Sequence, residues 1–411
     1  MANVISDTEN VASAPSAIPI MRRGLVIAGI LLIAANLRAS ITVVGPLLGE
    51  VRTDLDISST TASALISLPL LCFAVFSPVA PVIAARWGME RTLAAALGML
   101  ALAIVIRSVP WMPALWIGTV SLGMSIATMN VLLPALLKRD FPTEAGRLTG
   151  IFSAVSAAVA ATASGLAVPI AGLTDHGWRI AFGIWAAMAL IGFGVFLPQL
   201  RRRTLPKHDH AAALDSHPGG HRSPWRSALG WQITIFMGVQ SLFFYTVLTW
   251  WPTIEESHGT TAATAGLHQG IMQIFSIVGS LLTAVLLHKL PKDQRGAVLG
   301  LVSVAAVAVL GQLLLPSWAL LWNAFLGIGI GGSIVIALSF FAIRTVNHGQ
   351  AAALSGMAQS VGYLLAATGP LVFGALHDAV DSWTTSLIAL LVLLAVQLVF
   401  GSLAGRNKTL G

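Results

Sequence analysis

Long apolar runs alternate along the 411-residue chain with short breaks that carry charge, proline or glycine. A helix needs about 20 mostly apolar residues to cross the hydrocarbon core of a membrane. The pattern therefore predicts an all-α integral membrane protein with twelve transmembrane helices. Their expected ranges are 24–49, 60–85, 91–109, 113–137, 147–173, 179–199, 228–252, 262–288, 297–315, 318–342, 350–376 and 383–404.

Composition supports this interpretation. The chain is 56% hydrophobic and 9% charged, against about 25% charged residues in ordinary soluble domains. Its one cysteine, Cys72, lies in an apolar run, so we expect a buried packing residue and no intrachain disulfide. Residues 1–20 have no basic segment ahead of an apolar core and are expected to form a disordered cytoplasmic tail, not a signal peptide.

The basic residues predict the orientation. Of the 23 Lys and Arg residues, 19 fall in the segments that share a side with both termini, and only Arg52, Arg107 and Arg179 fall on the other side. The positive-inside rule then places both termini in the cytoplasm, with the protein in a bacterial inner membrane. The net charge of +7 is thus a topology signal, and no nucleic-acid partner is expected.

The longest internal polar stretch, 201–226, divides the chain into two parts. We interpret it as a cytoplasmic linker between six-helix halves at 21–200 and 227–405, followed by a cytoplasmic tail at 406–411. Four histidines in the linker suggest a metal site, but Pro218 and two glycines would break a helix that aligned them. A solvated loop is favoured, and no metal or cofactor is expected. These histidines are His208, His210, His217 and His221.

The two halves repeat each other at a constant offset of 206 positions. The matched pairs are Pro46 with Pro252, Arg86 with Lys292, Trp116 with Trp322, Lys138 with Arg344, and "LTG" (148–150) with "LSG" (354–356). Because each half has an even number of spans, both would enter the membrane in the same orientation. Such parallel repeats are related by an axis along the membrane normal, with the substrate site between them.

Several motifs carry a family resemblance. "PVIAARWGMERT" (81–92) is similar to the loop signature of the major facilitator superfamily, although Ala85 stands where an aspartate is usual. "NLR" (36–38), "NVLLPALLKRDFP" (130–142) and "SGMAQSVGYLLAATGP" (355–370) resemble the cyanate/2-nitroimidazole porter family (CynX/NimT) within it. The resemblance runs over essentially the whole chain. It implies the major facilitator fold, a central cavity and transport of small polar solutes or organic anions.

Arg38 lies near the centre of the first span, where a charge costs several kcal/mol and is usually functional. None of the 16 acidic residues is expected at the same depth; Glu50 is twelve residues on, about 18 Å along a helix. Arginine cannot lose its proton to escape this cost. We favour a cavity-facing residue that binds a carboxylate-like or linear anion, over a structural arginine that bonds helix carbonyls.

Helical spacing suggests roles for the neighbours of Arg38. Thr42 is four residues on and should share its face, whereas Asn36 points to the opposite side. We expect Asn36 to bond an adjacent helix, or Arg38 itself through local unwinding. Gly45 and Pro46 would permit a gating bend, and Arg86 and Arg91 in the signature loop are further gating candidates.

Other polar side chains are expected near mid-depth in spans four, seven, eight and eleven. Spans three, six, nine and twelve are almost purely aliphatic and are expected at the periphery. For each amide, an interhelical hydrogen bond is the alternative to substrate binding. The further substrate-binding candidates are Asn130, Gln240, Tyr245, Trp251, Gln273, Gln359 and Tyr363.

The sequence thus predicts a secondary active or facilitative transporter that moves a small anion, cyanate-like or a small carboxylate, by alternating access. The alternative is an exporter of a neutral or weakly basic heteroaromatic such as 2-nitroimidazole. An enzyme is disfavoured because no acid, base or metal-ligand cluster gathers at one membrane face. The expected partners are a small-molecule substrate and the lipid bilayer, and the expected state is a monomer.

Energy coupling is left open at this level. With no carboxylate or histidine expected at mid-depth, we expect facilitated transport, exchange, or coupling through acids at the outer rim such as Glu50 or Asp378. His268 lies toward the outer end of a span and is interpreted as an interfacial histidine, with access to the cavity as the alternative.

Overall fold

The computed structural model describes residues 20–141, 145–174, 177–201, 223–290, 292–346 and 348–410. Within these ranges every regular element is a helix. Twelve segments are long and apolar enough to cross a membrane, which confirms the predicted number. The N-terminal tail to residue 19, and linker residues 202–222 with their four histidines, lie outside the described residues.

The first half runs from residue 20 to residue 201. Its helices are α1 (Ile20–Asn36), α2 (Ala39–Thr42), η1 (Gly45–Leu47), α3 (Leu48–Leu55), α4 (Ser59–Phe76), α5 (Val79–Trp87), α6 (Met89–Arg107), α7 (Met112–Asp140), α8 (Ala145–Ala171), α9 (Gly177–Gly183), α10 (Trp185–Phe196) and η2 (Leu197–Arg201). Helices α6, α7 and α8 match predicted spans to within a few residues, whereas the predicted spans 24–49, 60–85 and 179–199 are each divided into shorter helices.

The second half runs from residue 223 to residue 410. Its helices are η3 (Pro224–Arg226), α12 (Ala228–Ser257), α13 (Ala262–Lys289), α14 (Arg295–Leu314), η4 (Pro316–Trp318), α15 (Ala319–Ile343), α16 (His348–Val380) and α17 (Trp383–Ala404). The repeat is visible in the helix boundaries, since the first residues of α6 and α14, Met89 and Arg295, are 206 positions apart.

The first span differs from the prediction of one continuous helix. Between residues 24 and 55 the chain forms four helical pieces, with breaks after Asn36 and after Thr42. Gly45 and Pro46 start the short 3-10 helix η1, because proline lacks an N–H and fits the first turn of a helix. The matching proline of the second half, Pro252, lies inside the unbroken α12.

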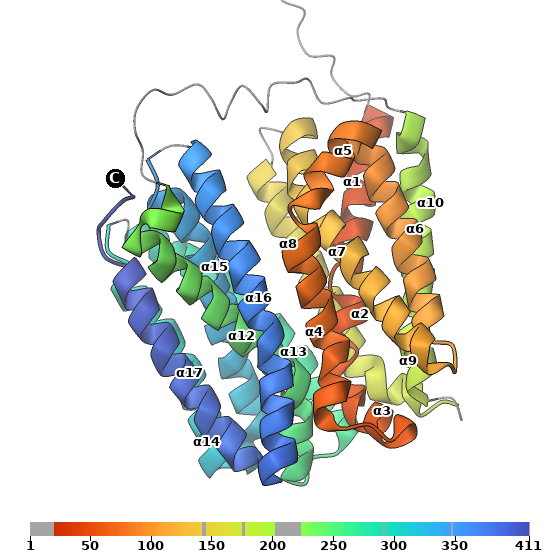
Figure 1. The fold of residues 1–411 in the computed structure, drawn as a ribbon, viewed down its shortest axis with the longest axis vertical. Helices are drawn as coiled ribbons and strands as arrows, with labels where there is room; N and C mark the ends of the chain where they lie inside the picture. The colour runs from red at the N-terminus through yellow and green to blue at the C-terminus, as the bar shows by residue number, and fades with distance from the viewer. Residues whose placement is uncertain are drawn as a thin grey trace, which may run out of the picture.

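The two halves lie side by side, with α4 against α16 and α8 against α13 (Figure 1). Helices α6, α10, α14 and α17 pack within their own halves, as expected for peripheral helices. The "basic end" is defined here as the end that holds Arg86, Arg226 and Arg406. The opposite end, with α3 and the turn between α12 and α13, is called the "α3 end".

Small residues allow α8 and α13 to approach closely. A Cβ added at Gly270 would lie 2.9 Å from the Ala161 carbonyl oxygen, and one at Gly266 would lie 2.9 Å from that of Ser164. Contacts this short are absent between real Cβ atoms and carbonyls, so both positions need glycine. The small residues of α8 and α13 therefore serve close approach of the two backbones.

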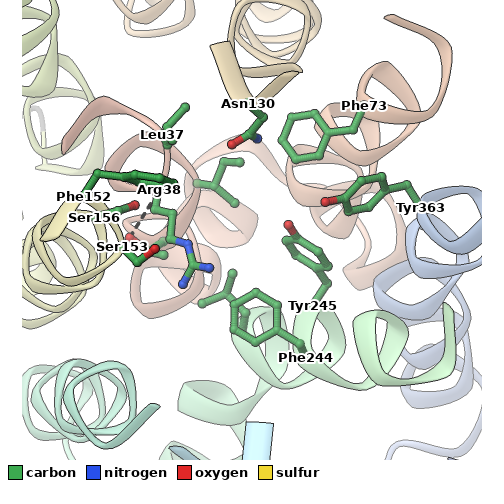
Figure 2. Close-up of a pocket in the computed structure, with 13 residues that line it drawn as sticks. Leu37, Arg38, Phe73, Asn130, Phe152, Ser153, Ser156, Phe244, Tyr245 and Tyr363 are labelled. Carbon is green, nitrogen blue, oxygen red and sulfur yellow. Dashed lines mark hydrogen bonds between the residues drawn. The ribbon is translucent and has the colours of Figure 1, made fainter. Parts of the chain in front are cut away.

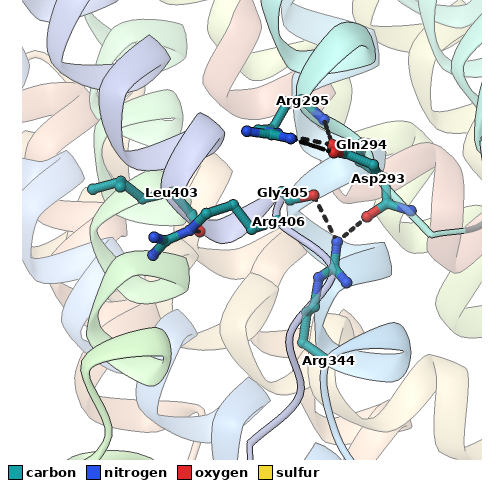
Figure 3. Close-up of polar contacts among 7 residues, drawn as sticks. All are labelled: Asp293, Gln294, Arg295, Arg344, Leu403, Gly405 and Arg406. Atoms are coloured by element: carbon teal, nitrogen blue, oxygen red, sulfur yellow. Dashed lines mark hydrogen bonds and ion pairs between the residues drawn. The ribbon is translucent and has the colours of Figure 1, made fainter.

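At the basic end, a buried arginine ties the C-terminal segment to the bundle (Figure 3). Arg344 is 2% exposed and donates to the carbonyl oxygens of Ala404 (3.1 Å) and Gly405 (2.9 Å) and to the side chain of Gln294. In the first half, Arg139 reaches Glu90 at 2.7 Å. Arg344 thus joins the end of α15 to the end of α17 and the start of α14, whereas Arg139 joins the end of α7 to the start of α6.

Candidate substrate-binding cavity

A cavity of about 160 Å³ lies between the two halves (Figure 2). The α1–α2 junction, α2, α4, α7 and α8 of the first half line it, as do α12 and α16 of the second half. Its lining residues are Leu37, Arg38, Ile41, Thr42, Phe73, Asn130, Phe152, Ser153, Ser156, Phe244, Tyr245, Leu248 and Tyr363.

The break in the first span presents Arg38 to this cavity. Helix α1 ends at Asn36, and Arg38 has φ −122° and ψ −32°, outside the helical range. Its carbonyl oxygen then accepts hydrogen bonds from the N–H groups of Ile41 and Thr42, both at 3.0 Å, so that Arg38 starts α2. Arg38 and Thr42 both line the cavity, as their spacing predicted.

Asn36 stabilises this break. Its side-chain amide donates to the carbonyl oxygen of Leu32 at 2.8 Å, within α1, and to that of Met188 at 3.4 Å, in α10. The expected bond to an adjacent helix is therefore present, and no bond from Asn36 to Arg38 is seen among the described residues. Asn36 is 1% exposed and does not line the cavity, so its place among the substrate-binding candidates is not supported by this geometry.

The guanidinium of Arg38 is accessible and unpaired. Among the described residues, no carboxylate lies within ion-pair distance of it and no acceptor bonds it. The guanidinium carbon lies over the ring of Phe244, 5.9 Å from its centroid. A structural arginine that bonds helix carbonyls would have shown such bonds. The cavity therefore contains a cation whose counter-charge is not supplied by the described protein.

Aromatic side chains form much of the wall around Arg38. Tyr363 packs edge-on against Phe73 with centroids 5.6 Å apart, and Tyr245 packs edge-on against Phe244 at 4.8 Å. The hydroxyls of both tyrosines point into the cavity (Figure 2) and have no hydrogen-bond partner among the described residues. The site thus combines flat apolar surfaces with free hydroxyl groups on the side opposite Arg38.

Three further polar groups complete the lining. Asn130 was expected here and lies at the cavity surface. Ser153 and Ser156 were missed, because serine in a small-residue helix looks like packing. The Ser156 hydroxyl is buried and has no partner among the described residues. Their spacing of three residues, which puts both on one face of α8, is the signal that would have revealed them.

Four other candidates do not reach the cavity. Gln240 turns toward α14, α15 and α17, and its amide donates to the Ser241 hydroxyl at 2.9 Å. Gln273 and Trp251 are each 0% exposed, inside the packing of the second half. Gln359 lies one turn from Tyr363 and donates to the Ser355 hydroxyl at 2.7 Å. Their substrate-binding roles stay predictions that this geometry does not support, because depth along a helix does not specify which face turns inward.

The gating candidates fall into two groups. Gly45 lies where η1 meets the second half, and a Cβ there would overlap the carbonyl oxygen of Leu248. Pro46 packs beside Gly266 of α13. Arg86 and Arg91 are exposed at the basic end, and no polar contact with another described residue is seen for either side chain. The structure therefore places only the first pair at the contact between the halves.

The α3 end is closed by contacts between the halves. The hydrogen bonds seen between described residues of the two halves all end on Asp378 of α16. Its carboxylate accepts from the N–H of Ser59 (3.3 Å), the N–H of Thr60 (3.0 Å) and the Thr60 hydroxyl (2.9 Å), at the start of α4. A carboxylate at a helix N-terminus is favoured by the helix dipole, so this contact stabilises the closed α3 end.

Comparison with known proteins agrees with this architecture. Residues 30–370 match the model of the Major Facilitator Superfamily. The chain is 41% identical to a 2-nitroimidazole transporter of Escherichia coli (strain K12), over 94% of this chain and 96% of the relative. It is also 50% identical to a putative anionic 4-hydroxy-benzoate permease of Thauera aromatica, over 26% of this chain and 64% of that protein.

A solved structure shows the same fold at low sequence identity. The crystal structure of a D-xylose-proton symporter superposes with a TM-score of 0.75, at 14% identity, covering 95% of this chain and 99% of the other. These matches confirm the family predicted from the sequence motifs and exclude the enzyme class. The chain belongs to the major facilitator superfamily of membrane transporters.

Proposed function

We propose that this transporter carries a single-ring aromatic solute bearing a planar pair of oxygen atoms, as in a carboxylate or a nitro group. The observation that carries the proposal is the unpaired guanidinium of Arg38 in an aromatic-walled cavity of about 160 Å³. A cavity of about 150 Å³ is known to hold benzene, so the space suits one ring with small substituents. Cyanate alone would leave most of it unfilled.

Each part of the site has a role in this proposal. The planar fork of Arg38 can donate two parallel hydrogen bonds to a carboxylate or nitro group. The rings of Phe73, Phe244 and Tyr245 offer edges and faces to the solute ring. The free Tyr363 hydroxyl can bond a polar substituent at the far end of the ring.

This proposal includes both substrate classes expected from the sequence. A small anion and a nitro-substituted heteroaromatic present the same planar oxygen pair to Arg38, although only the first carries a full charge. The named relatives transport a nitroimidazole and, putatively, a hydroxybenzoate, which are both single rings of this kind. A strongly cationic solute is disfavoured, because no carboxylate among the described residues lines the cavity.

The orientation is part of the proposal. If the positive-inside rule places the basic end in the cytoplasm of a bacterium, the closed α3 end faces outward and this conformation faces inward. Alternating access then requires that the contacts of Asp378 and Gly45 break while the basic end closes. We propose that a monomer carries out this cycle in the inner membrane.

The test is a ligand-dependent stability measurement on purified protein, followed by uptake into proteoliposomes. Benzoate, 4-hydroxybenzoate and 2-nitroimidazole should raise the melting temperature by mass action, and cyanate should do so less. Charge-assisted hydrogen bonds contribute about 1.5–3 kcal/mol, so Arg38→Ala should weaken binding about tenfold to a hundredfold. Arg38→Lys should recover only part of this loss, because lysine lacks the fork.

Arg86→Ala is the matched control, since it removes an exposed arginine away from the cavity. It should bind every ligand as the wild type does. Unchanged binding and uptake in both Arg38→Ala and Arg38→Lys would refute the proposed role. Stabilisation by 2-nitroimidazole alone, retained in Arg38→Ala, would leave export of a neutral heteroaromatic as the function.

A further inference from the structure

A buried acid–base pair lies in the second half, away from the cavity. Glu255, near the end of α12, is 0% exposed, and one of its carboxylate oxygens lies 2.7 Å from Nδ1 of His268 in α13. The other oxygen accepts a hydrogen bond from the side-chain amide of Asn323 in α15. The sequence predicts an interfacial histidine at His268 and gives no sign that it pairs with Glu255.

Few other charged groups surround this pair. Glu256 and His258 follow on α12, while α13 contributes only His268 at this end and α15 contributes no charge. The nearby helices α3 and α16 contribute Glu50, Arg52, Asp54, His377 and Asp378. Most of these are engaged elsewhere: Glu50 with the N–H of Trp178, Asp54 with Arg179, Asp378 with Thr60, and His377 stacked on Trp383.

The pair adjoins the contact between the two halves. Gln269, the residue after His268, donates to the Leu248 carbonyl oxygen at 2.6 Å, which links α13 to α12. A Cβ at Gly45 of the first half would meet both of these groups. One at Gly49 would lie 3.8 Å from the Glu256 carboxylate. The segments that hold Glu255 and His268 are therefore the ones against which η1 and α3 close.

We propose that Glu255 and His268 form a proton-binding site that links the opening of the α3 end to proton release. A buried carboxylate is costly unless it is paired, so the closed state favours a net-neutral pair that holds one proton between Oε2 and Nδ1. Opening separates α12 and α13 from η1 and admits water. The imidazolium can then release its proton, leaving neutral His268 and a hydrated Glu255 carboxylate.

Thermodynamic linkage gives the direction of the effect. Because the closed state binds the proton more tightly, low pH favours closure of the α3 end and high pH favours opening. The site is distinct from Arg38 and does not depend on which solute the cavity binds.

The experiment measures the opening itself. Spin labels at Thr53→Cys and Ala379→Cys, two exposed positions in α3 and α16, report the separation of the halves in a Cys72→Ala background. We expect the wild-type distance distribution to move from short to long as the pH rises from 5 to 8. Glu255→Gln, which imitates the protonated acid, should stay closed at both pH values. His268→Gln leaves a charged carboxylate without its proton donor and should stay open at both.

His258→Gln is the matched control. His258 is exposed on the same turn, and among the described residues its ring contacts only Ile254 and Ser257 of α12, so this variant should keep the wild-type pH profile. If the pair had only a structural role, Glu255→Gln and His268→Gln would shift the distance distribution between the labels in the same direction. That result, or a wild-type distance that does not change with pH, or a pH response that survives both variants, would overturn the proposal. A wild-type distance that does not change with pH would overturn the proposal even if a variant fails to fold.

Discussion

The Nη1 atom of Arg107 donates a hydrogen bond to the carbonyl oxygen of Ser40 at 3.0 Å, joining α6 to α2. Arg107 is 1% exposed, and its guanidinium carbon lies 4.2 Å from the ring centroid of Phe182. Its Nε and Nη2 atoms have no partner among the described residues. Because Ser40 is two residues after Arg38, this bond helps to hold the turn that presents Arg38 to the cavity.

Arg107→Met should therefore weaken ligand binding without lowering the stability of the protein. Removing a buried, incompletely bonded charge is often neutral or stabilising, so the melting temperature without ligand should change little or rise. Loss of the bond to Ser40 should loosen α2 and weaken ligand binding about threefold to tenfold. Thermal unfolding with and without ligand measures both effects. Arg91→Met, which removes an exposed arginine, is the control, and unchanged affinity in Arg107→Met would contradict a positioning role.

Tyr363→Phe tests recognition at the far end of the solute. Its hydroxyl faces the cavity and has no partner among the residues that the structure describes, and one neutral hydrogen bond contributes about 0.5–1.5 kcal/mol. We expect about twofold to tenfold weaker binding of 4-hydroxybenzoate and no change for benzoate, which lacks the hydroxyl. Competition between the two compounds for uptake gives the ratio of their affinities in the wild type and in the variant. Equal losses for both compounds would show that the ring of Tyr363 matters and its hydroxyl does not.

Gly45→Ala should prevent closure of the α3 end. The new Cβ would overlap the Leu248 carbonyl oxygen, a backbone atom that cannot move aside cheaply. The population open at the α3 end should increase and net transport should fall by more than tenfold. Labels at positions 53 and 379 report the opening. Gly194→Ala is the control, because no atom lies within 4 Å of its Cβ position; normal transport by Gly45→Ala would argue against this contact.

Asp378→Asn should weaken the closed α3 end more modestly. The amide keeps an acceptor oxygen for α4 but loses the charge, which the helix N-terminus stabilises by about 0.3–1 kcal/mol. The open population should rise about twofold to fivefold in the same distance measurement. Asp381→Asn provides the comparison, since Asp381 has φ +49° and asparagine tolerates that conformation. An identical shift in both variants would indicate a general charge effect at this end of the molecule.

Arg344→Lys should destabilise the second half without changing the cavity. Lysine cannot reproduce the three acceptor contacts of the buried fork, at Ala404, Gly405 and Gln294. We expect a loss of about 2–3 kcal/mol in the free energy of unfolding, since buried acceptors are left unpaired. Denaturant unfolding measures it. Arg295→Lys, at an exposed arginine in the same region, should change stability little, and ligand affinity should be normal in both variants.

Much of the fold was predictable from local composition. Helices in lipid must satisfy their backbone groups internally, so length and apolarity alone identify spans. The twelve ranges follow from this constraint, and the 206-residue offset comes from matched residues in the two halves. The broken first span does not, because glycine and proline permit a break and do not require one. Pro46 lies at such a break whereas its counterpart Pro252 lies inside a continuous helix.

A residue of the candidate site could be predicted from the sequence only where its burial in the membrane would be energetically costly. Arg38 could be recognised because a charge at that depth needs a cavity or a ligand, and the cavity lies beside it. Gln240 and Gln273 were indistinguishable from Asn130 at the sequence level, since an amide can be satisfied by another helix. Ser156 was invisible because serine also suits close helix packing.

The sequence by itself determined the membrane-spanning class, the number of spans, the two-half organisation and the charge that the cavity must accommodate. These depend on the transfer of whole segments, or of one arginine, from water into lipid. Only the tertiary structure decided which face of each helix turns inward, which residues share the cavity and that Glu255 meets His268. These relationships join residues that are between 13 and more than 300 positions apart in the chain. They depend on packing geometry that no local pattern contains.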